Sequence, residues 1–268
     1  MILASDTPLI WWLALPTAAA YLLTGWVGPR VSARRGQWLA WCPWGLHGLG
    51  LLFVLFAPQE GGVRFGFAPA LSVTVWLLLT FYLLEHHWFP QLRMRWMLML
   101  LGAAMVVLAA QFPGAALHVS ASPWLPLHWA LGIACYGLFA AAVVHAWLMQ
   151  RAERQIRLAS DNPVGLPLLT LERLTFRFVD AGFVLLSATL LAGWWFGEAL
   201  YGSAWQWNHK TVFSMLAWLT FAVLLLGRHR FGWRGRTAVR VLYTGAGLLL
   251  LAYVGSRFVI EVILGRAL

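Results

Sequence analysis

Long apolar runs are the feature that most constrains this chain. A helix needs about 20 mostly apolar residues to cross the hydrocarbon core of a bilayer. Eight runs of about this length are present, at 8–27, 37–56, 67–87, 94–112, 124–149, 178–199, 209–227 and 239–262. Only 10% of the residues are charged, against about 25% in soluble domains. The sequence therefore predicts one all-α domain over residues 1–268, a bundle of eight transmembrane helices.

The basic residues alternate between successive connections. All but four of the 19 Lys and Arg residues fall in the connections 28–36, 88–95, 150–177 and 228–240, the exceptions being Arg64, Lys210, Arg257 and Arg266. Cytoplasmic loops of membrane proteins are enriched in Lys and Arg. We therefore expect a multi-pass protein of the bacterial inner (plasma) membrane with both termini outside, and we read the net charge of +10 as topology and not as nucleic-acid binding.

The sequence carries little that indicates turnover chemistry. Cys42 and Cys135 lie singly within two of the predicted helices, without the spacing of a zinc or dithiol motif. We find no nucleophile–base set and no phosphate-binding loop, so no catalytic residue is assigned. The chain is expected to act as an assembly or delivery factor and not as a turnover enzyme.

Histidine positions suggest a metal complex near the outer face. His128 and His209 begin two predicted helices there, His118 lies in an outer loop, and His47 lies near the middle of the second predicted helix. Imidazoles on different helices can hold haem iron from two sides, which makes His128 and His209 the metal-ligand candidates. The alternative for each histidine is an ordinary hydrogen-bonding role at the membrane interface.

The loop between the sixth and seventh predicted helices is rich in tryptophan. Trp205 and Trp207 offer flat apolar faces that suit a porphyrin, or they belong to the aromatic belt found at membrane interfaces. Lys210 and Arg257 are candidates for pairing with haem propionates. Glu261 lies four residues after Arg257, so an internal ion pair is the favoured role for that arginine.

The segment 201–210, Tyr-Gly-Ser-Ala-Trp-Gln-Trp-Asn-His-Lys, resembles the Trp-Gly-x-x-Trp-x-Trp-Asp-x-Lys (WWD-like) motif of the cytochrome c assembly family. That family contains haem-handling membrane proteins of the CcsA and CcmC kind. Gly202, Trp205, Trp207 and Lys210 match the motif, whereas Tyr201 replaces the first Trp and Asn208 replaces Asp.

Four further segments resemble the YpjD-like branch of this family, which is related to HemX-type proteins; they are 166–174, 209–218, 232–236 and 251–261. In synthetase-type members the resemblance implies axial histidines on both sides of the Trp-rich segment. No outward-facing histidine follows His209 here, so an axial pair would join His209 with His128, His118 or His47.

The resemblance implies a haem-binding or haem-handling protein of cytochrome c biogenesis, with a modified Trp-rich platform on the outer face. Its implied partners are membrane lipid, haem, and cytochrome c maturation proteins or apocytochrome. The alternative is a haem-free permease or a regulatory partner subunit of the HemX kind. A permease is expected to show internal repeats and helices broken at mid-depth, and neither is evident in the sequence.

Overall fold

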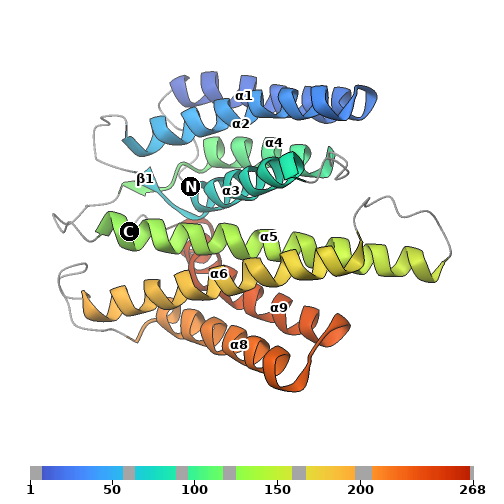
Figure 1. The fold of residues 1–268 in the computed structure, drawn as a ribbon. Coiled ribbons are helices and arrows are strands. Elements are labelled where there is room, and N and C mark those ends of the chain that lie inside the picture. The colour runs from blue at the N-terminus through green and yellow to red at the C-terminus, as the bar shows by residue number, and fades with distance from the viewer. Residues whose placement is uncertain are drawn as a thin grey trace. The chain divides into compact units, whose positions relative to one another are not determined.

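The computed structural model describes residues 8–56, 64–88, 96–116, 125–158, 167–196 and 207–265, which are almost entirely helical. The chain divides into two compact units by its internal contacts. The first unit comprises Met1–Val119, Pro163–Gly165 and Arg257–Leu268, and the second comprises Ser120–Asn162 and Leu166–Ser256. Figure 1 shows the helices of both units, and each unit is described separately below.

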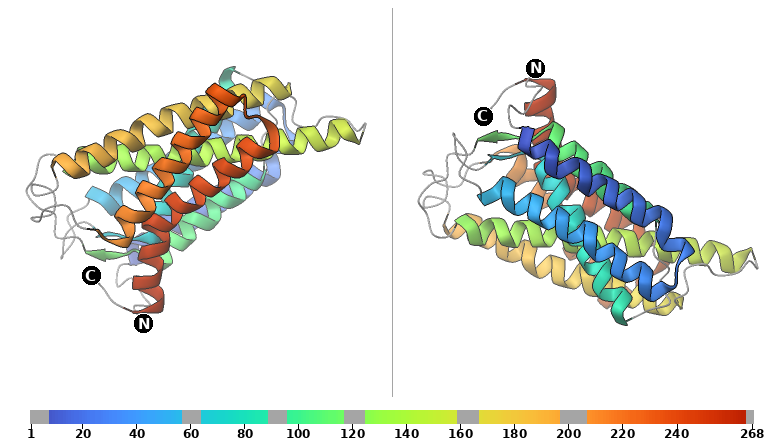
Figure 2. Two further views of the ribbon diagram at one scale, coloured as in Figure 1. Left: turned by 90° about the horizontal axis from the view of Figure 1, so that it is seen from below. Right: turned by 90° about the horizontal axis from the view of Figure 1, so that it is seen from above.

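Four helices form a closed ring in the first unit: α1 (Pro8–Val27), α2 (Ala33–Phe56), α3 (Phe67–Trp88) and α4 (Trp96–Gln111). Helix α1 packs on α2 and α4, and α3 packs on the same two helices. The short helix η1 (Gly28–Arg30) joins α1 to α2. Successive helices run in opposite directions, as the right view in Figure 2 shows. Their facing side chains therefore enclose one core.

A small β ribbon lies at the end of this unit where α3 begins. Strand β1 (Arg64–Phe65) pairs antiparallel with β2 (Ala115–Ala116). Gly114, just before β2, has a φ of 83°, a conformation that residues with a Cβ rarely adopt. A Cβ at Gly114 would also lie 2.6 Å from the Phe65 carbonyl carbon. Glycine therefore permits both the turn and the close approach of the two strands.

The second unit is built from two helical hairpins. Its helices are α5 (Leu125–Arg157), α6 (Leu168–Trp195), α8 (His209–Phe231) and α9 (Gly235–Leu250). The α5–α6 pair has the most extensive contact in the chain, followed within this unit by α8–α9. Phe139 of α5 stacks on Phe221 of α8 with 3.9 Å between ring centroids. The last turns of α5 extend beyond the start of α6 (Figures 1 and 2).

Helix α8 ends in a glycine turn that leads directly into α9. Gly232 has a φ of 64° and its N–H bonds to the Arg228 carbonyl, while the Trp233 N–H bonds to the Gly227 carbonyl. This arrangement satisfies carbonyl groups that the end of a helix would otherwise leave unpaired. The Trp233 ring then lies directly against Gly227, where a Cβ would come within 2.4 Å of it.

The chain after α9 remains helical but adopts a π-helical hydrogen-bonding pattern twice. The π-helical segments η2 (Leu251–Gly255) and η3 (Val259–Ile263) flank the short helix α10 (Ser256–Phe258). π-helical turns are rare and occur often at functional sites. Tyr136 of α5 donates a hydrogen bond to the Leu249 carbonyl beside η2.

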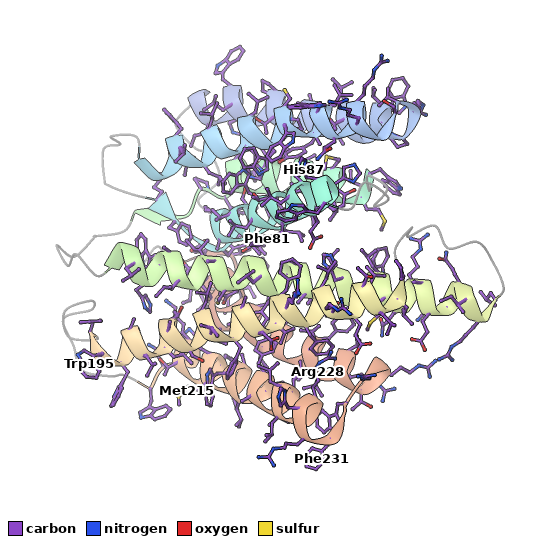
Figure 3. All side chains as sticks on the ribbon, viewed as in Figure 1. Phe81, His87, Trp195, Met215, Arg228 and Phe231 are labelled. Atoms are coloured by element: carbon purple, nitrogen blue, oxygen red, sulfur yellow. The ribbon has the colours of Figure 1, made fainter. Side chains whose placement is uncertain are left out.

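Basic side chains gather where α6 begins and α8 ends. Glu172 accepts a hydrogen bond from Arg228 Nη1 at 2.9 Å, and Arg234 Nε lies 3.7 Å from the same carboxylate oxygen. The Arg228 guanidinium also lies 3.6 Å from the centroid of the Phe176 ring. In Figure 3, Arg228 lies at the opposite end of this unit from Trp195. One carboxylate thus brings together arginines that are separate in the sequence.

Six helical segments in the described part of the chain are long and apolar enough to cross a membrane. They are α1, α3, α5, α6, α8 and the helix that starts at α9. The 16-residue α4 is shorter, and α2 does not meet the same requirement. The all-α class is therefore confirmed, whereas the count of eight spans stays a prediction. Helix α6 begins at Leu168, ten residues before the predicted run 178–199.

Candidate functional site

His128 lies in the first turns of α5 and packs against α6. Its side chain is half-buried and hydrogen-bonds a backbone group of Thr189. Its Cε1 atom would lie 3.4 Å from a Cβ placed on Gly193, so the absence of a side chain at Gly193 leaves room for the imidazole. Packing and a hydrogen bond together fix the ring of His128 at this end of the second unit.

The start of α8 presents three of the predicted site residues. Trp207 and His209 are exposed and Lys210 is half-buried. Asn208 is the N-cap of α8: its Oδ1 accepts hydrogen bonds from the Thr211 N–H at 3.0 Å and from the Thr211 hydroxyl at 3.1 Å. A capping side chain satisfies an otherwise unpaired N–H of the first helical turn. The cap therefore fixes the backbone at the start of α8, from which the side chains of His209 and Lys210 extend.

Lys210 contacts the π-helical segment η2. Its Nζ atom lies 5.6 Å from the centroid of the Tyr253 ring, within the range of a cation–π interaction. This contact with Tyr253 holds the Lys210 ammonium group near the start of α8. The aromatic partner is Tyr253, a residue that the sequence pattern does not connect with the Trp-rich loop.

Exposed indoles gather around the same end of the second unit. Trp194 and Trp195 close α6 with exposed fractions of 63% and 77%, and Trp207 precedes α8 with 72% exposed. Helix α5 begins, α6 ends and α8 begins at this end (Figure 1). Imidazole, indole and ammonium groups therefore share one end of the unit, a donor set that fits an anionic, flat metal complex such as haem.

His47 has a different environment, in the core of the first unit. Its Nδ1 atom lies 3.0 Å from the Tyr21 hydroxyl, and its Nε2 atom lies 2.8 Å from Ser72 Oγ. All three side chains are buried. Both ring nitrogens are thus engaged by neighbouring helices, so binding to iron would require one of these hydrogen bonds to break.

Arg257 also belongs to the first unit, where it forms the expected pair with Glu261. Arg257 Nη1 lies 3.8 Å from Glu261 Oε1, and both side chains are almost completely buried. The carboxylate lies against the backbone at Gly66, because a Cβ there would be 2.7 Å from Glu261 Oε2. The internal ion pair favoured from the sequence is confirmed.

Two predicted site residues, His118 and Trp205, lie outside the described residues, as does the motif segment 201–206. Among the described residues, no three His, Cys, Asp or Glu side chains come together to form a metal-binding group. The structure brings His128, Trp207, His209 and Lys210 to one end of the second unit. It places His47 and Arg257 in the first unit.

Several residues of these sites were not identified from the sequence. Asn208 stands immediately before a helix, a recognisable capping signal, whereas the motif comparison identifies it only as a replacement for Asp. Gly193 becomes informative only once His128 is seen to pack on it. Tyr21 and Ser72 are 26 and 25 residues from His47 along the chain, and no short-range pattern connects them.

Six membrane-capable apolar segments and connections rich in arginine define a multi-pass membrane protein. The family model described as "Cytochrome C assembly protein" matches residues 39–264. The chain therefore belongs to the cytochrome c assembly protein family.

Relatives place the chain among multi-pass inner-membrane proteins. It is 34% identical over 149 residues to the "Inner membrane protein YpjD" of Escherichia coli, covering 54% of this chain and 56% of that protein. It is 31% identical over 114 residues to the "Cytochrome c biogenesis protein CcsA" of Synechococcus elongatus, covering 42% of this chain and 32% of CcsA. The matches thus span only about a third to a half of these relatives' lengths. No solved structure matches the chain.

Proposed function

We propose that this protein binds haem at the outer end of its second unit and handles it during cytochrome c biogenesis. The observation that supports this proposal is the presence of His128, Trp207, His209 and Lys210 at one end of a single unit. Membership of the cytochrome c assembly family and the similarity to a protein named for cytochrome c biogenesis point in the same direction.

Each residue has a distinct role in this proposal. His128 and His209 would supply imidazole ligands from α5 and α8, two separate helices. The indole of Trp207 would offer an apolar surface to the porphyrin, and Lys210 would pair with a propionate in exchange for its contact with Tyr253. Bound haem would supply the iron that imidazoles recognise. The protein residues orient the haem and shield it from water.

The membrane topology belongs to the same proposal. We infer eight spans, with α2 and α4 crossing alongside the six longer or more apolar helices. The arginines around Glu172 would then face the cytoplasm and the start of α8 would face outward, in agreement with the distribution of basic residues. Haem bound at the start of α8 would be presented to partners outside, such as an apocytochrome or its maturation proteins.

An absorbance spectrum tests the proposal directly. The protein purified from cells with ample haem is expected to show a Soret band, or to acquire one when haem is added. His128→Ala and His209→Ala are each expected to shift this band and to lower the haem content sharply, because each would remove an imidazole that holds the iron. If wild-type protein shows no band under either condition, the proposed function is wrong.

His229→Ala is the matched control for His209→Ala. Both histidines are exposed on α8, but His229 lies in its last turn and His209 in its first. The control is expected to retain the wild-type spectrum. A Soret band that survives unchanged in both His128→Ala and His209→Ala would contradict the ligand assignment while leaving haem binding intact.

A further inference from the structure

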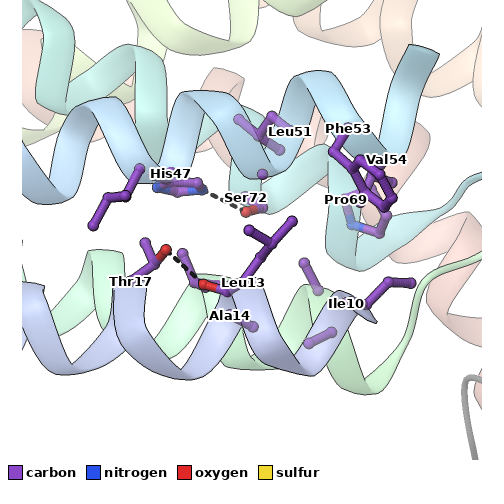
Figure 4. A pocket seen from close by; sticks show the side chains of 15 residues that line it. Ile10, Leu13, Ala14, Thr17, His47, Leu51, Phe53, Val54, Pro69 and Ser72 are labelled. Carbon is purple, nitrogen blue, oxygen red and sulfur yellow. Dashed lines mark hydrogen bonds between the residues drawn. The ribbon is translucent and has the colours of Figure 1, made fainter. Parts of the chain in front are cut away.

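A cavity of about 50 Å³ lies within the α1–α4 ring of the first unit (Figure 4). Its walls are almost wholly aliphatic and come from all four helices; they include Leu13, Ala14, Gly50, Val54, Pro69 and Ala110. Leu13 and Gly50 are only half-buried, so the cavity lies close to the surface of the α1–α2 pair. An enclosed space of this kind favours an apolar, uncharged occupant.

Polar side chains are confined to one side of the cavity. His47, Ser72 and Thr17 line it there, as Figure 4 shows. The Thr17 hydroxyl is already committed, since it donates to the Leu13 carbonyl at 2.7 Å. His47 and Ser72 belong to the buried Tyr21–His47–Ser72 chain of hydrogen bonds. A ligand therefore meets one polar group that is not fully used, at Ser72.

Counting protons along that chain identifies the unused group. A neutral imidazole donates from one ring nitrogen and accepts at the other. If Tyr21 donates to His47, then His47 donates to Ser72, and the hydroxyl proton of Ser72 remains available to the cavity. If Ser72 donates instead, the remaining proton is on Tyr21, which does not line the cavity. A ligand in the cavity can accept the Ser72 proton of the first arrangement but cannot reach the Tyr21 proton of the second. A bound ligand with a hydrogen-bond acceptor therefore favours the arrangement in which Tyr21 donates to His47 and His47 donates to Ser72.

Size and lining narrow the class of ligand. One water needs about 10–15 Å³ of such space, so the cavity admits a group of only a few heavy atoms. This is far smaller than a porphyrin, and the only aromatic rings among the described residues of the walls are those of Phe53 and His47. A carbonyl oxygen accepts a hydrogen bond without adding charge, and the first carbons of an aliphatic chain fill the rest of the space.

We propose that this cavity binds a small aliphatic carbonyl compound, a ketone or ester dissolved in the membrane, whose oxygen accepts a hydrogen bond from Ser72. The site is separate from the proposed haem site, since it lies in the first unit and uses none of the same residues. A result that contradicts haem binding would leave this inference unchanged, and a result that contradicts ligand binding in the cavity would leave the haem proposal unchanged.

Gly50 permits a variant that adds a bulky side chain at the cavity wall. A Cβ at Gly50 meets no atom within 4 Å, so Gly50→Leu starts without a clash at its Cβ, and its side chain competes with a ligand for the space that Gly50 lines. Gly45 is the matched control, because it lies in the same helix and its Cβ also meets nothing within 4 Å, yet it does not line the cavity. Gly45→Leu therefore makes the same glycine-to-leucine change in the same helix, but away from the cavity.

The test uses the full-length protein in lipid nanodiscs. Butanone labelled at its carbonyl carbon is titrated and its carbonyl resonance is followed by NMR. Wild type and Gly45→Leu are expected to give the same saturable shift, and Gly50→Leu is expected to give none. Saturable binding to Gly50→Leu with wild-type affinity, or no saturable binding to wild type, overturns the proposal.

A second ligand tests the hydrogen bond. The alkene in which CH₂ replaces the oxygen of butanone has nearly the same shape but lacks the oxygen that would accept the hydrogen bond from Ser72. Ser72→Ala is expected to weaken butanone binding about three- to tenfold and to leave alkene binding unchanged. Equal losses for both ligands, or no loss for butanone, contradict the assignment of a carbonyl class. Unchanged alkene binding by Ser72→Ala also establishes that this variant is folded.

Discussion

Asn208 holds the start of α8 in place through its side-chain amide. The position is one at which the family motif has a carboxylate, and either side chain presents an oxygen to the first helical turn. We expect Asn208→Ala to lower the free energy of unfolding by about 1 kcal/mol, because the Thr211 N–H loses its acceptor. Thermal unfolding in detergent, followed by tryptophan fluorescence, measures this loss.

Asn208→Asp is the control for the same position. It keeps the capping oxygen and adds a negative charge near the positive end of the helix dipole, an effect of about 0.3–1 kcal/mol in the stabilising direction. Its melting temperature is therefore expected to equal or exceed that of wild type. A destabilised Asn208→Asp variant, or an unaffected Asn208→Ala variant, would show that the cap contributes nothing to stability.

Single residues were predictable to different extents. The Arg257–Glu261 pair follows from i,i+4 spacing, and the structure contains it. The hydrogen-bond partners of His47 come from α1 and α3, so they could not be predicted without the packing of those helices. His118 and Trp205 remain sequence predictions, because they lie outside the described residues.

At the scale of elements, glycine decides how closely α8 and α9 approach through their turn. Gly227 lies under the Trp233 ring, where a Cβ would come within 2.4 Å of Cε3 and 2.5 Å of Cδ2. We expect Gly227→Ala to destabilise the protein by about 1–3 kcal/mol, because the indole must move out of its packed position. A lower melting temperature and a shifted tryptophan emission are the measurements.

Gly247 of α9 provides the opposite case. A Cβ at Gly247 meets nothing within 4 Å, so Gly247→Ala gains helix propensity without a clash. It is expected to stabilise the protein by about 0.5–1 kcal/mol. If Gly227→Ala and Gly247→Ala change the melting temperature equally, close packing at Gly227 is not what restrains the turn.

Helices were the most predictable elements, because apolar length alone identifies them. The predicted run 8–27 coincides with α1, and 209–227 falls within α8. The β1–β2 ribbon was not predicted, since each strand has only two residues and their pairing depends on the close approach at Gly114. The π-helical turns were also missed, because their hydrogen-bond shift leaves no periodic pattern in so short a segment.

At the scale of the whole molecule, the distribution of arginine predicts which connections face the cytoplasm. In a background with Cys42→Ser and Cys135→Ala, Ser203→Cys is expected to react with an impermeant maleimide in intact spheroplasts. Arg236→Cys is expected to react only after the membrane is opened, because its connection carries the cytoplasmic charge excess. The opposite labelling pattern, or equal labelling of both sites, would contradict the proposed orientation.

The first unit is not made from consecutive residues, because Arg257–Leu268 joins the helices that begin the chain. Phe258 packs edge-on against Phe67, and the Glu261 carboxylate lies over Gly66. During synthesis the ribosome releases α1 to α4 long before these last residues. This side of the first unit is therefore covered only after the residues from Arg257 onward have been synthesised. A chain that stopped before Arg257 would leave Gly66 and Phe67 without the contacts that Glu261 and Phe258 make with them.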